Sequence, residues 1–448
     1  MQSGTTHQDP PEEGGAARMS RLATWIDRQP RWVLTIYAMA AAFAAYASMY
    51  AFRKPFTAAE YQGLTAFSVV GVVFSYKSIA VISQLLGYMC SKFIGIKVAS
   101  EATFSRRVPL VLGLIGCAEI MLVLFGLVPQ PWNIVFLFFN GLPLGMVWSL
   151  LFGLLEGRRV TEFLGLGMSI SVIFSSGWVK AVGRLTIEQA NVSEFWMPAV
   201  TGLLFTPLLL LSLAMLQHLP PPDALDRAQR TERAPMSRAQ RHAFVLKHAP
   251  GLVLLVLGYM MLMAYRDLRD SFMPDILREM GHAVDSGSFA RIESFVGLLV
   301  IPAMFLLWFF KDNRHGVWAN MTLVTIGSLL LGSATLLFQS GRLSPGMFYM
   351  VNGAGLYIAF VPYQSTLMDR LLASLHTVAT ASFLIAIADS FGYLSTVSLY
   401  LTRDIYGNFV GRSIPWATLL IVASYVVMVG VPLAILGSGL YFRKHLRA

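Results

Sequence analysis

Residues 217–249 read QHLPPPDALDRAQRTERAPMSRAQRHAFVLKHA, a hydrophilic stretch with three consecutive prolines and many arginines. Long apolar runs dominate the chain on both sides of it. Each run approaches the roughly 20 residues with which an α-helix crosses about 30 Å of hydrocarbon. Six runs precede residue 217 and six follow residue 248, once helix ends that carry charges are included. The sequence therefore predicts two sets of six membrane helices, joined by this connector.

The expected fold class is all-α, a polytopic membrane protein. Backbone polar groups in lipid must be satisfied within the spanning structure, and the Leu-, Val-, Ala- and Phe-rich runs fit helices better than the alternating strands of a barrel. The predicted helices are 32–55, 65–90, 107–127, 131–155, 163–184, 196–216, 250–273, 290–310, 317–338, 345–368, 374–400 and 414–440.

The same pattern divides the chain into four segments. Residues 1–30 are polar and rich in Gly, Pro and acidic residues, which predicts a disordered cytoplasmic tail without the apolar core of a signal peptide. A first six-helix bundle follows over 31–216, a cytoplasmic linker over 217–248, and a second six-helix bundle over 249–448. Carriers built from two similar bundles have this arrangement, with a central site that opens alternately to each side. A two-bundle membrane enzyme or receptor would have the same hydropathy pattern.

The composition excludes an ordinary soluble domain, because only 13% of the 448 residues are charged, about half of the usual share. Lysine and arginine gather on alternate connecting segments, which predicts that both termini are cytoplasmic. The expected location is the cell inner (plasma) membrane. The formal charge of +10 reflects this bias, so we expect the lipid bilayer and no nucleic acid as a partner.

Motifs of catalysis and of metal binding are absent from the sequence. The two cysteines, Cys90 and Cys117, lie in or beside apolar runs, so we expect neither a disulfide nor a metal site. No P-loop, HExxH or GxSxG motif occurs in its proper context. We therefore expect no cofactor and no enzyme, and an ATP-driven pump is excluded on this chain alone.

Basic residues stand at the ends of the first and seventh predicted helices, which open the two halves. The first ends MYAFRKPF, with Arg53 and Lys54, and the seventh ends AYRDLRDSFMP, with Arg266 and Arg269 before Pro274. If a pseudo-twofold axis relates the halves, these helix ends face each other across a central cavity and two guanidinium groups converge there. Two planar forks of donors suit a tetrahedral oxyanion, so phosphate or a phosphorylated solute is the expected guest.

Two structural interpretations compete with this functional one. Arg53 and Lys54 could be anchors that snorkel to the membrane surface. Arg266 could pair along its own helix, with Asp270 four residues on or with the adjacent Asp267. The matching position of the arginines in both halves favours the functional interpretation.

Other polar residues lie within the predicted helices. Lys77, in FSYKSIAVI, is far from both predicted ends of its helix and is expected to face the cavity. Tyr46 and Tyr50 share one face close to Arg53 and could donate hydrogen bonds to a bound oxyanion, or could form a structural aromatic stripe. Lys180 could snorkel, because it lies one turn from a helix end.

Two carboxylates of the predicted helices have open roles. Asp389, in IAIADSFGYL, could couple transport to protons or be the counter-ion of a basic residue. The ion pair is favoured, because an unpaired buried carboxylate tends to be neutralised. Glu119 in the third helix is equally ambiguous.

Five short motifs are spread along most of the chain: AAYASMYAFRKPF, FLFFNGLPLGMVW, YRDLRDSFMP, GLYIAFVP and SFGYL. They resemble motifs of the organophosphate:phosphate antiporters of the major facilitator superfamily, the glycerol-3-phosphate and hexose-phosphate transporter type. The resemblance implies a 12-helix fold of two six-helix bundles and exchange of an organophosphate for phosphate. It also implies that Arg53 and Arg266 grip the phosphate, in a cavity lined by Lys77, Tyr46, Tyr50, Tyr357 and Tyr393.

The sequence thus predicts a monomeric secondary active transporter of a small anionic solute, which works by alternating access. Two alternatives remain open. A transporter-like sensor would bind a phosphorylated metabolite and signal without moving it. A proton-coupled carrier of another solute would use Asp389 or Glu119.

Overall fold

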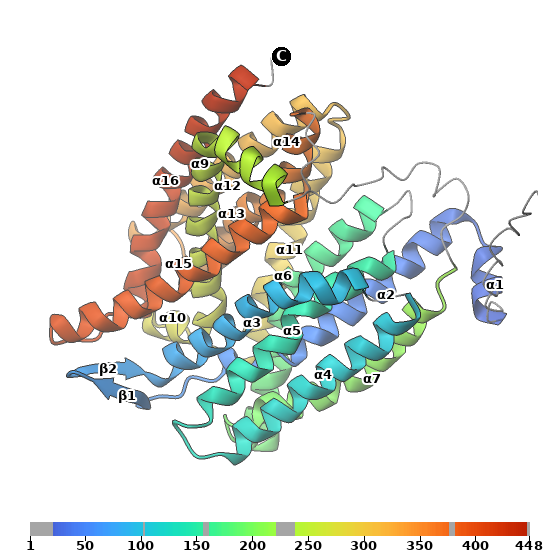
Figure 1. Cartoon of the computed structure of the whole chain (residues 1–448). Helices are drawn as coiled ribbons and strands as arrows, with labels where there is room; N and C mark the ends of the chain where they lie inside the picture. The colour runs from blue at the N-terminus through green and yellow to red at the C-terminus, as the bar shows by residue number, and fades with distance from the viewer. Residues whose placement is uncertain (1–20, 102–103, 156–160, 221–237, 376–380, 446–448) are drawn as a thin grey trace, which may run out of the picture.

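The structure, a computed structural model, describes residues 21–101, 104–155, 161–220, 238–375 and 381–445 (Figure 1). Twelve long helices run back and forth through this part of the chain. In the first half they are α2 (Arg31–Ala51), α3 (Tyr76–Glu101), α4 (Phe104–Leu127), α5 (Ile134–Leu155), α6 (Thr161–Ala190) and α7 (Met197–Gln217). In the second half they are α9 (Arg238–Ser271), α11 (Ser286–Trp308), α12 (Asn313–Gln339), α13 (Pro345–Pro362), α15 (Ala381–Phe409) and α16 (Trp416–His445). Among the described residues, nine helices are long and apolar enough to cross a membrane, and the predicted polytopic helical fold is confirmed.

Short elements mark the two ends of the molecule. They are α1 (Arg21–Asp27), the 3₁₀ turn η1 (Pro55–Ala58), strands β1 (Thr65–Val69) and β2 (Val72–Ser75), α10 (Met273–Glu279), and a π-helical turn η2 (Tyr363–Leu367) that leads from α13 into α14 (Met368–Ser374). We call the end that carries β1, β2 and α10 the hairpin end (Figure 1). The opposite end, with α1 and the carboxyl end of α16, is called the terminal end.

The helix boundaries differ from the predicted ones next to the expected tail and linker. Helix α1 lies within the segment 1–30 that was predicted to be a disordered tail. Helix α9 begins at Arg238 and so includes the last part of the predicted linker over 217–248. The rest of these two predictions falls on residues 1–20 and 221–237, outside the described residues.

The predicted helix over 65–90 is wrong in its first part, because residues 65–75 form the antiparallel hairpin β1–β2. Its two-residue turn is Val70 and Gly71, with φ angles of 51° and 79°. A tight turn of this kind needs positive φ at both positions and matches the natural twist of the strands. Valine and phenylalanine dominate TAFSVVGVVFS and favour strands, although their hydropathy equals that of a membrane helix. The helix itself begins only at Tyr76.

Glycines allow neighbouring helices in both halves to touch at the backbone. A Cβ atom on Gly141 of α5 would lie 2.3 Å from the carbonyl oxygen of Gln84 in α3. In the second half, a Cβ on Gly355 of α13 would lie 2.5 Å from the backbone nitrogen of Leu331 in α12. The second and fourth long helices of the first half, and the third and fourth long helices of the second half, therefore pack at backbone contact.

Replacing Gly141 by leucine is expected to destabilise the protein by about 1–3 kcal/mol or more, because the new side chain would need the space of the α3 backbone. Thermal unfolding in detergent measures the effect. Gly113→Leu is the matched control, since a Cβ atom on this exposed glycine of α4 meets nothing within 4 Å. Equal melting temperatures for both variants would contradict the backbone contact.

Candidate functional site

The end of α2 is held by two buried amide side chains. The helix ends at Ala51, so the following carbonyl groups lack helical partners. Asn140 of α5 donates to the carbonyl oxygen of Phe52 at 3.1 Å, and Gln84 of α3 donates to that of Arg53 at 2.9 Å. Gln84 also donates to the side-chain oxygen of Asn140 at 2.8 Å. This pair of amides fixes the backbone from which Arg53 extends.

A small cavity lies between the two halves, with room for about one water molecule. Side chains of α6, α9, α13 and the end of α2 line it: Tyr50, Arg53, Lys54, Val172, Ser176, Arg266, Asp270 and Tyr357. The structure therefore brings six of the residues singled out in the sequence to one place, with both arginines among them. Both halves of the chain contribute to its wall.

Arg53 has no ion-pair partner among the described residues. Its guanidinium carbon lies 3.8 Å from the ring centre of Tyr88 and 6.0 Å from that of Tyr50. The side chain is buried, and its Nε atom has no hydrogen-bond acceptor within the described part of the chain. Aromatic faces attract a cation but do not satisfy its N–H donors, so these donors remain available to an anion.

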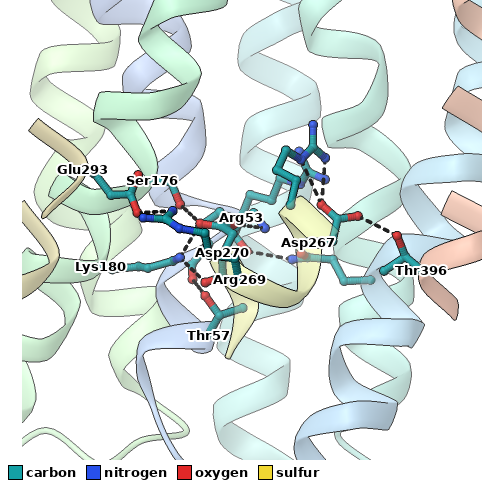
Figure 2. Close-up of polar contacts among 12 residues, drawn as sticks. Arg53, Thr57, Ser176, Lys180, Asp267, Arg269, Asp270, Glu293 and Thr396 are labelled. Carbon is teal, nitrogen blue, oxygen red and sulfur yellow. Dashed lines mark hydrogen bonds and ion pairs between the residues drawn. The ribbon is translucent and has the colours of Figure 1, made fainter. Parts of the chain in front are cut away.

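Arg266 is paired with the residue next to it. Its Nη2 atom lies 2.7 Å from Oδ1 of Asp267, and Oδ2 of Asp267 accepts from Thr396 at 3.1 Å (Figure 2). Its guanidinium carbon also lies 4.6 Å from the ring centre of Phe360. Of the two pairings considered from the sequence, the structure thus contains the one with Asp267 and not the one with Asp270.

Asp270 joins the two halves (Figure 2). Its Oδ1 atom lies 2.5 Å from Nζ of Lys180 and accepts from Ser176 at 2.5 Å. Its Oδ2 atom lies 2.5 Å from Nζ of Lys54. The expectation that Lys180 snorkels is wrong, because its side chain is 2% exposed and points to this carboxylate. Ser176 and Lys180 lie four residues apart on one face of α6, and this spacing is visible in the sequence.

The remaining arginine of this segment is structural. Arg269 is 1% exposed, pairs with Glu293 of α11 at 2.7 Å and donates to the carbonyl oxygen of Tyr349 at 3.0 Å. A Cβ atom on Gly353 would lie 2.3 Å from its guanidinium, so α13 makes room for it with a glycine.

Lys77 does not line the cavity. Its Nζ atom lies 2.6 Å from Oδ2 of Asp275 in α10 and donates to the carbonyl oxygen of Ala59 at 2.6 Å. Its predicted position in mid-helix was wrong, because α3 begins at Tyr76 and places Lys77 in the first turn at the hairpin end. It therefore closes the contact between the halves at that end.

The other predicted site residues lie next to the cavity rather than in its wall. The Tyr46 ring contacts those of Tyr50 and Trp148, with centroid distances of 5.4 Å and 4.7 Å. The Tyr393 ring lies 5.7 Å from that of Tyr88, which itself packs on Arg53. These tyrosines form an aromatic layer that supports the arginine.

Asp389 is a counter-ion, as the sequence favoured. Its Oδ2 atom lies 3.2 Å from Nζ of Lys92 in α3, and its Oδ1 atom accepts from Tyr259 at 2.5 Å. Among the described residues, no group of three His, Cys, Asp or Glu side chains could hold a metal ion.

Positive charge exceeds negative charge around the cavity. In the described part of the chain, the cations of the cavity and of the ion pairs beside it are Arg53, Lys54, Lys77, Lys92, Lys180, Arg266 and Arg269. Their carboxylate partners are Asp267, Asp270, Asp275, Glu293 and Asp389. Seven cations against five carboxylates leave two positive charges unmatched, which a bound anion would neutralise.

Solved structures of transporters share the fold of this chain. A bacterial homologue of the human lysosomal transporter Spinster, in an inward-facing and unoccupied conformation, is 14% identical with a TM-score of 0.64, over 92% of this chain and 98% of that chain. The nucleoside transporter NupG is 14% identical with a TM-score of 0.60, over 90% and 98%. A D-xylose-proton symporter is 13% identical with a TM-score of 0.56, over 91% and 99%. These similarities establish the fold of the major facilitator superfamily.

Sequence comparison places the chain more narrowly. None of the curated proteins matches it. Residues 55–445 match a family model described as a family of unknown function, DUF5690, and this range includes nearly all of the twelve helices. This multi-pass membrane protein with the fold of the major facilitator superfamily therefore belongs to the DUF5690 family.

Proposed function

We propose that this protein is a secondary transporter of a small anionic solute, which it carries by alternating access. The observation that carries the proposal is the Arg53 guanidinium, buried at a cavity between the two halves without a carboxylate partner among the described residues. A charge in that position is costly unless something compensates it, and charged groups at membrane depth typically mark a pathway for substrate. Arg266 comes to the same cavity from the other half.

The hairpin end is the closed side of the proposed carrier. Ion pairs between the halves join Lys54 and Lys180 to Asp270, and Lys77 to Asp275. Nearby, Asn408 of α15 accepts from the backbone N–H of Val73 in the hairpin at 2.9 Å and donates to its carbonyl oxygen at 2.8 Å. With both termini in the cytoplasm, as the basic residues predict, this closed end faces outward.

An anion in the cavity would act on these contacts in two ways. It would neutralise the excess positive charge, so that the halves can approach on the terminal side. It would also compete with the Asp270 carboxylate for Lys54, which weakens the closure at the hairpin end. A ligand shifts a conformational equilibrium only by its differential affinity for the two states, and this competition provides such a difference.

Phosphate or a phosphorylated metabolite is the proposed substrate, with exchange of one for the other. Arginine forks match the geometry of a tetrahedral oxyanion, and Lys54 adds a point charge beside them. The resemblance of the first and seventh helices to the organophosphate:phosphate antiporters supports the same class. We expect the protein to act as a monomer.

Binding of a panel of anions to the purified protein tests the proposal. Phosphate and phosphorylated metabolites are expected to raise the melting temperature, with about 2.7 kcal/mol of stabilisation at a hundred times Kd. Chloride and an uncharged sugar are the controls. Counterflow in proteoliposomes then separates transport from sensing, since a sensor binds the anion without moving it. Equal melting curves with and without every phosphate compound would contradict an anion site of this kind.

A further inference from the structure

Glu119 differs from every other carboxylate described within the long helices near the cavity. Asp267, Asp270, Asp389 and Glu293 each contact a lysine or an arginine. Both carboxylate oxygens of Glu119, in the middle of α4, are buried, and neither has a hydrogen-bond partner in the described part of the chain.

Among the described residues, the helices that pack against α4 offer no counter-ion to Glu119. Helix α4 packs against α5 and α7, and neither Ile134–Leu155 nor Met197–Gln217 contains any ionisable side chain. The carboxylate packs against Gly202 of α7, in the space that the missing side chain of this glycine leaves. A Cβ atom on Gly202 would come within 2.4 Å of Oε2 of Glu119 and 3.0 Å of the Phe52 ring. The basic residues that follow Phe52 point elsewhere, since Arg53 packs on Tyr88 and Lys54 pairs with Asp270.

The basic residues and the thiol of α4 itself are also out of reach. Arg106 and Arg107 lie at the terminal end of the helix, more than three turns before Glu119, and Arg107 donates to the carbonyl oxygen of Gly153. Cys117 is exposed on the surface of the helix. An ionised carboxylate that is buried without a donor or counter-ion is so unfavourable that such a group typically holds a proton instead.

We propose that Glu119 is a proton-binding site, protonated in this conformation, and that its proton is coupled to the movement of the anion. Release is a simple ionisation: the carboxyl O–H bond breaks, the electron pair stays on the carboxylate, and the proton passes to water when α4 and α7 separate at Gly202. The coupling, unlike the proton site itself, rests on the proposed transport function.

The contacts of Asn140 provide the link between Glu119 and the anion site. Its side-chain nitrogen donates to the carbonyl oxygens of Ala118 at 3.0 Å and of Phe52 at 3.1 Å. These are the residues directly before Glu119 and Arg53. The Asn140 side chain thus connects the backbone next to Glu119 with the backbone next to Arg53. A shift of α4 when Glu119 ionises would therefore move the backbone that carries Arg53.

Infrared spectroscopy of the purified protein tests the proton site without any substrate. The wild type is expected to have a carboxylic acid carbonyl band that is missing in Glu119→Gln and retained in Asp389→Asn, whose carboxylate is ion-paired. Glutamine keeps the size and polarity of the protonated acid, so the variant should fold. Should it not fold, a pH titration of the wild-type band replaces it. Absence of any such band in the wild type, or its persistence in Glu119→Gln, overturns the proposal.

Proteoliposomes test the coupling. With a pH gradient across the membrane, the wild type is expected to accumulate phosphate, whereas Glu119→Gln should accumulate at least tenfold less and keep phosphate exchange near the wild-type rate. Gradient-driven accumulation that is unchanged in the variant refutes the coupling. If the wild type itself exchanges no phosphate compound, the proposed function fails, while the infrared result still decides the proton site.

Discussion

Arg53→Ala is expected to weaken phosphate binding by about 2–5 kcal/mol, or roughly 30-fold or more in Kd, and to abolish transport. The reason is that this buried guanidinium has no ion-pair partner and its Nε atom has no hydrogen-bond acceptor in the described part of the chain. Arg53→Lys keeps the charge but loses the planar fork, and should recover only part of the affinity. Binding and counterflow in proteoliposomes measure both effects.

The stability of the same variant distinguishes a substrate ligand from a structural arginine. Arg53→Ala leaves no carboxylate behind, so its melting temperature should stay close to that of the wild type. Arg269→Ala is the matched comparison, because it leaves the buried carboxylate of Glu293 without its ion-pair partner. This substitution should cost about 3–5 kcal/mol of folding stability. A large loss of stability in Arg53→Ala, equal to that of Arg269→Ala, would mean that Arg53 holds the fold together and is not reserved for an anion.

Asp270→Asn is expected to destabilise the protein by about 3–5 kcal/mol and to make its stability depend strongly on phosphate. The substitution leaves two buried ammonium groups, those of Lys54 and Lys180, without their anion. A bound phosphate could then take the place of the carboxylate, whereas in the wild type it must compete with Asp270. Melting curves with and without phosphate should therefore diverge more for the variant than for the wild type.

Asp389→Asn is the control for this experiment. This substitution also leaves a lysine, Lys92, without its ion-pair partner, but Lys92 and Asp389 lie outside the cavity wall. Its melting temperature should fall without any gain in the response to phosphate. If phosphate rescues both variants alike, general screening of charge explains the effect, and Asp270 is no competitor of the substrate.

Part of the site could be predicted because it follows from local chemistry. Arg53 and Arg266 stand at the ends of the opening helices of two similar bundles, and the symmetry of such bundles brings equivalent helix ends together. Both arginines line one cavity, with Tyr50 and Tyr357 beside them. The roles of these residues in binding remain predictions.

The partners of the charged side chains could not be predicted, because they lie far apart in the sequence. Lys180 and Asp270 are separated by 90 residues, and Lys54 reaches the same carboxylate from another helix. Nothing in the local sequence distinguishes the snorkelling lysine that was expected from the ion-paired lysine that the structure contains. Similarly, hydropathy did not separate the hairpin of residues 65–75 from a helix, since both are apolar.

The sequence by itself determined that this is a polytopic helical membrane protein, because each apolar run must satisfy its own backbone in lipid whatever its neighbours are. Only the tertiary structure decided which charges neutralise one another and that positive charge is in excess around the cavity. The physical reason is that an ion pair depends on the packing of helices in space, and the same residues at the same helix ends could be anchors, partners or ligands until that packing is known.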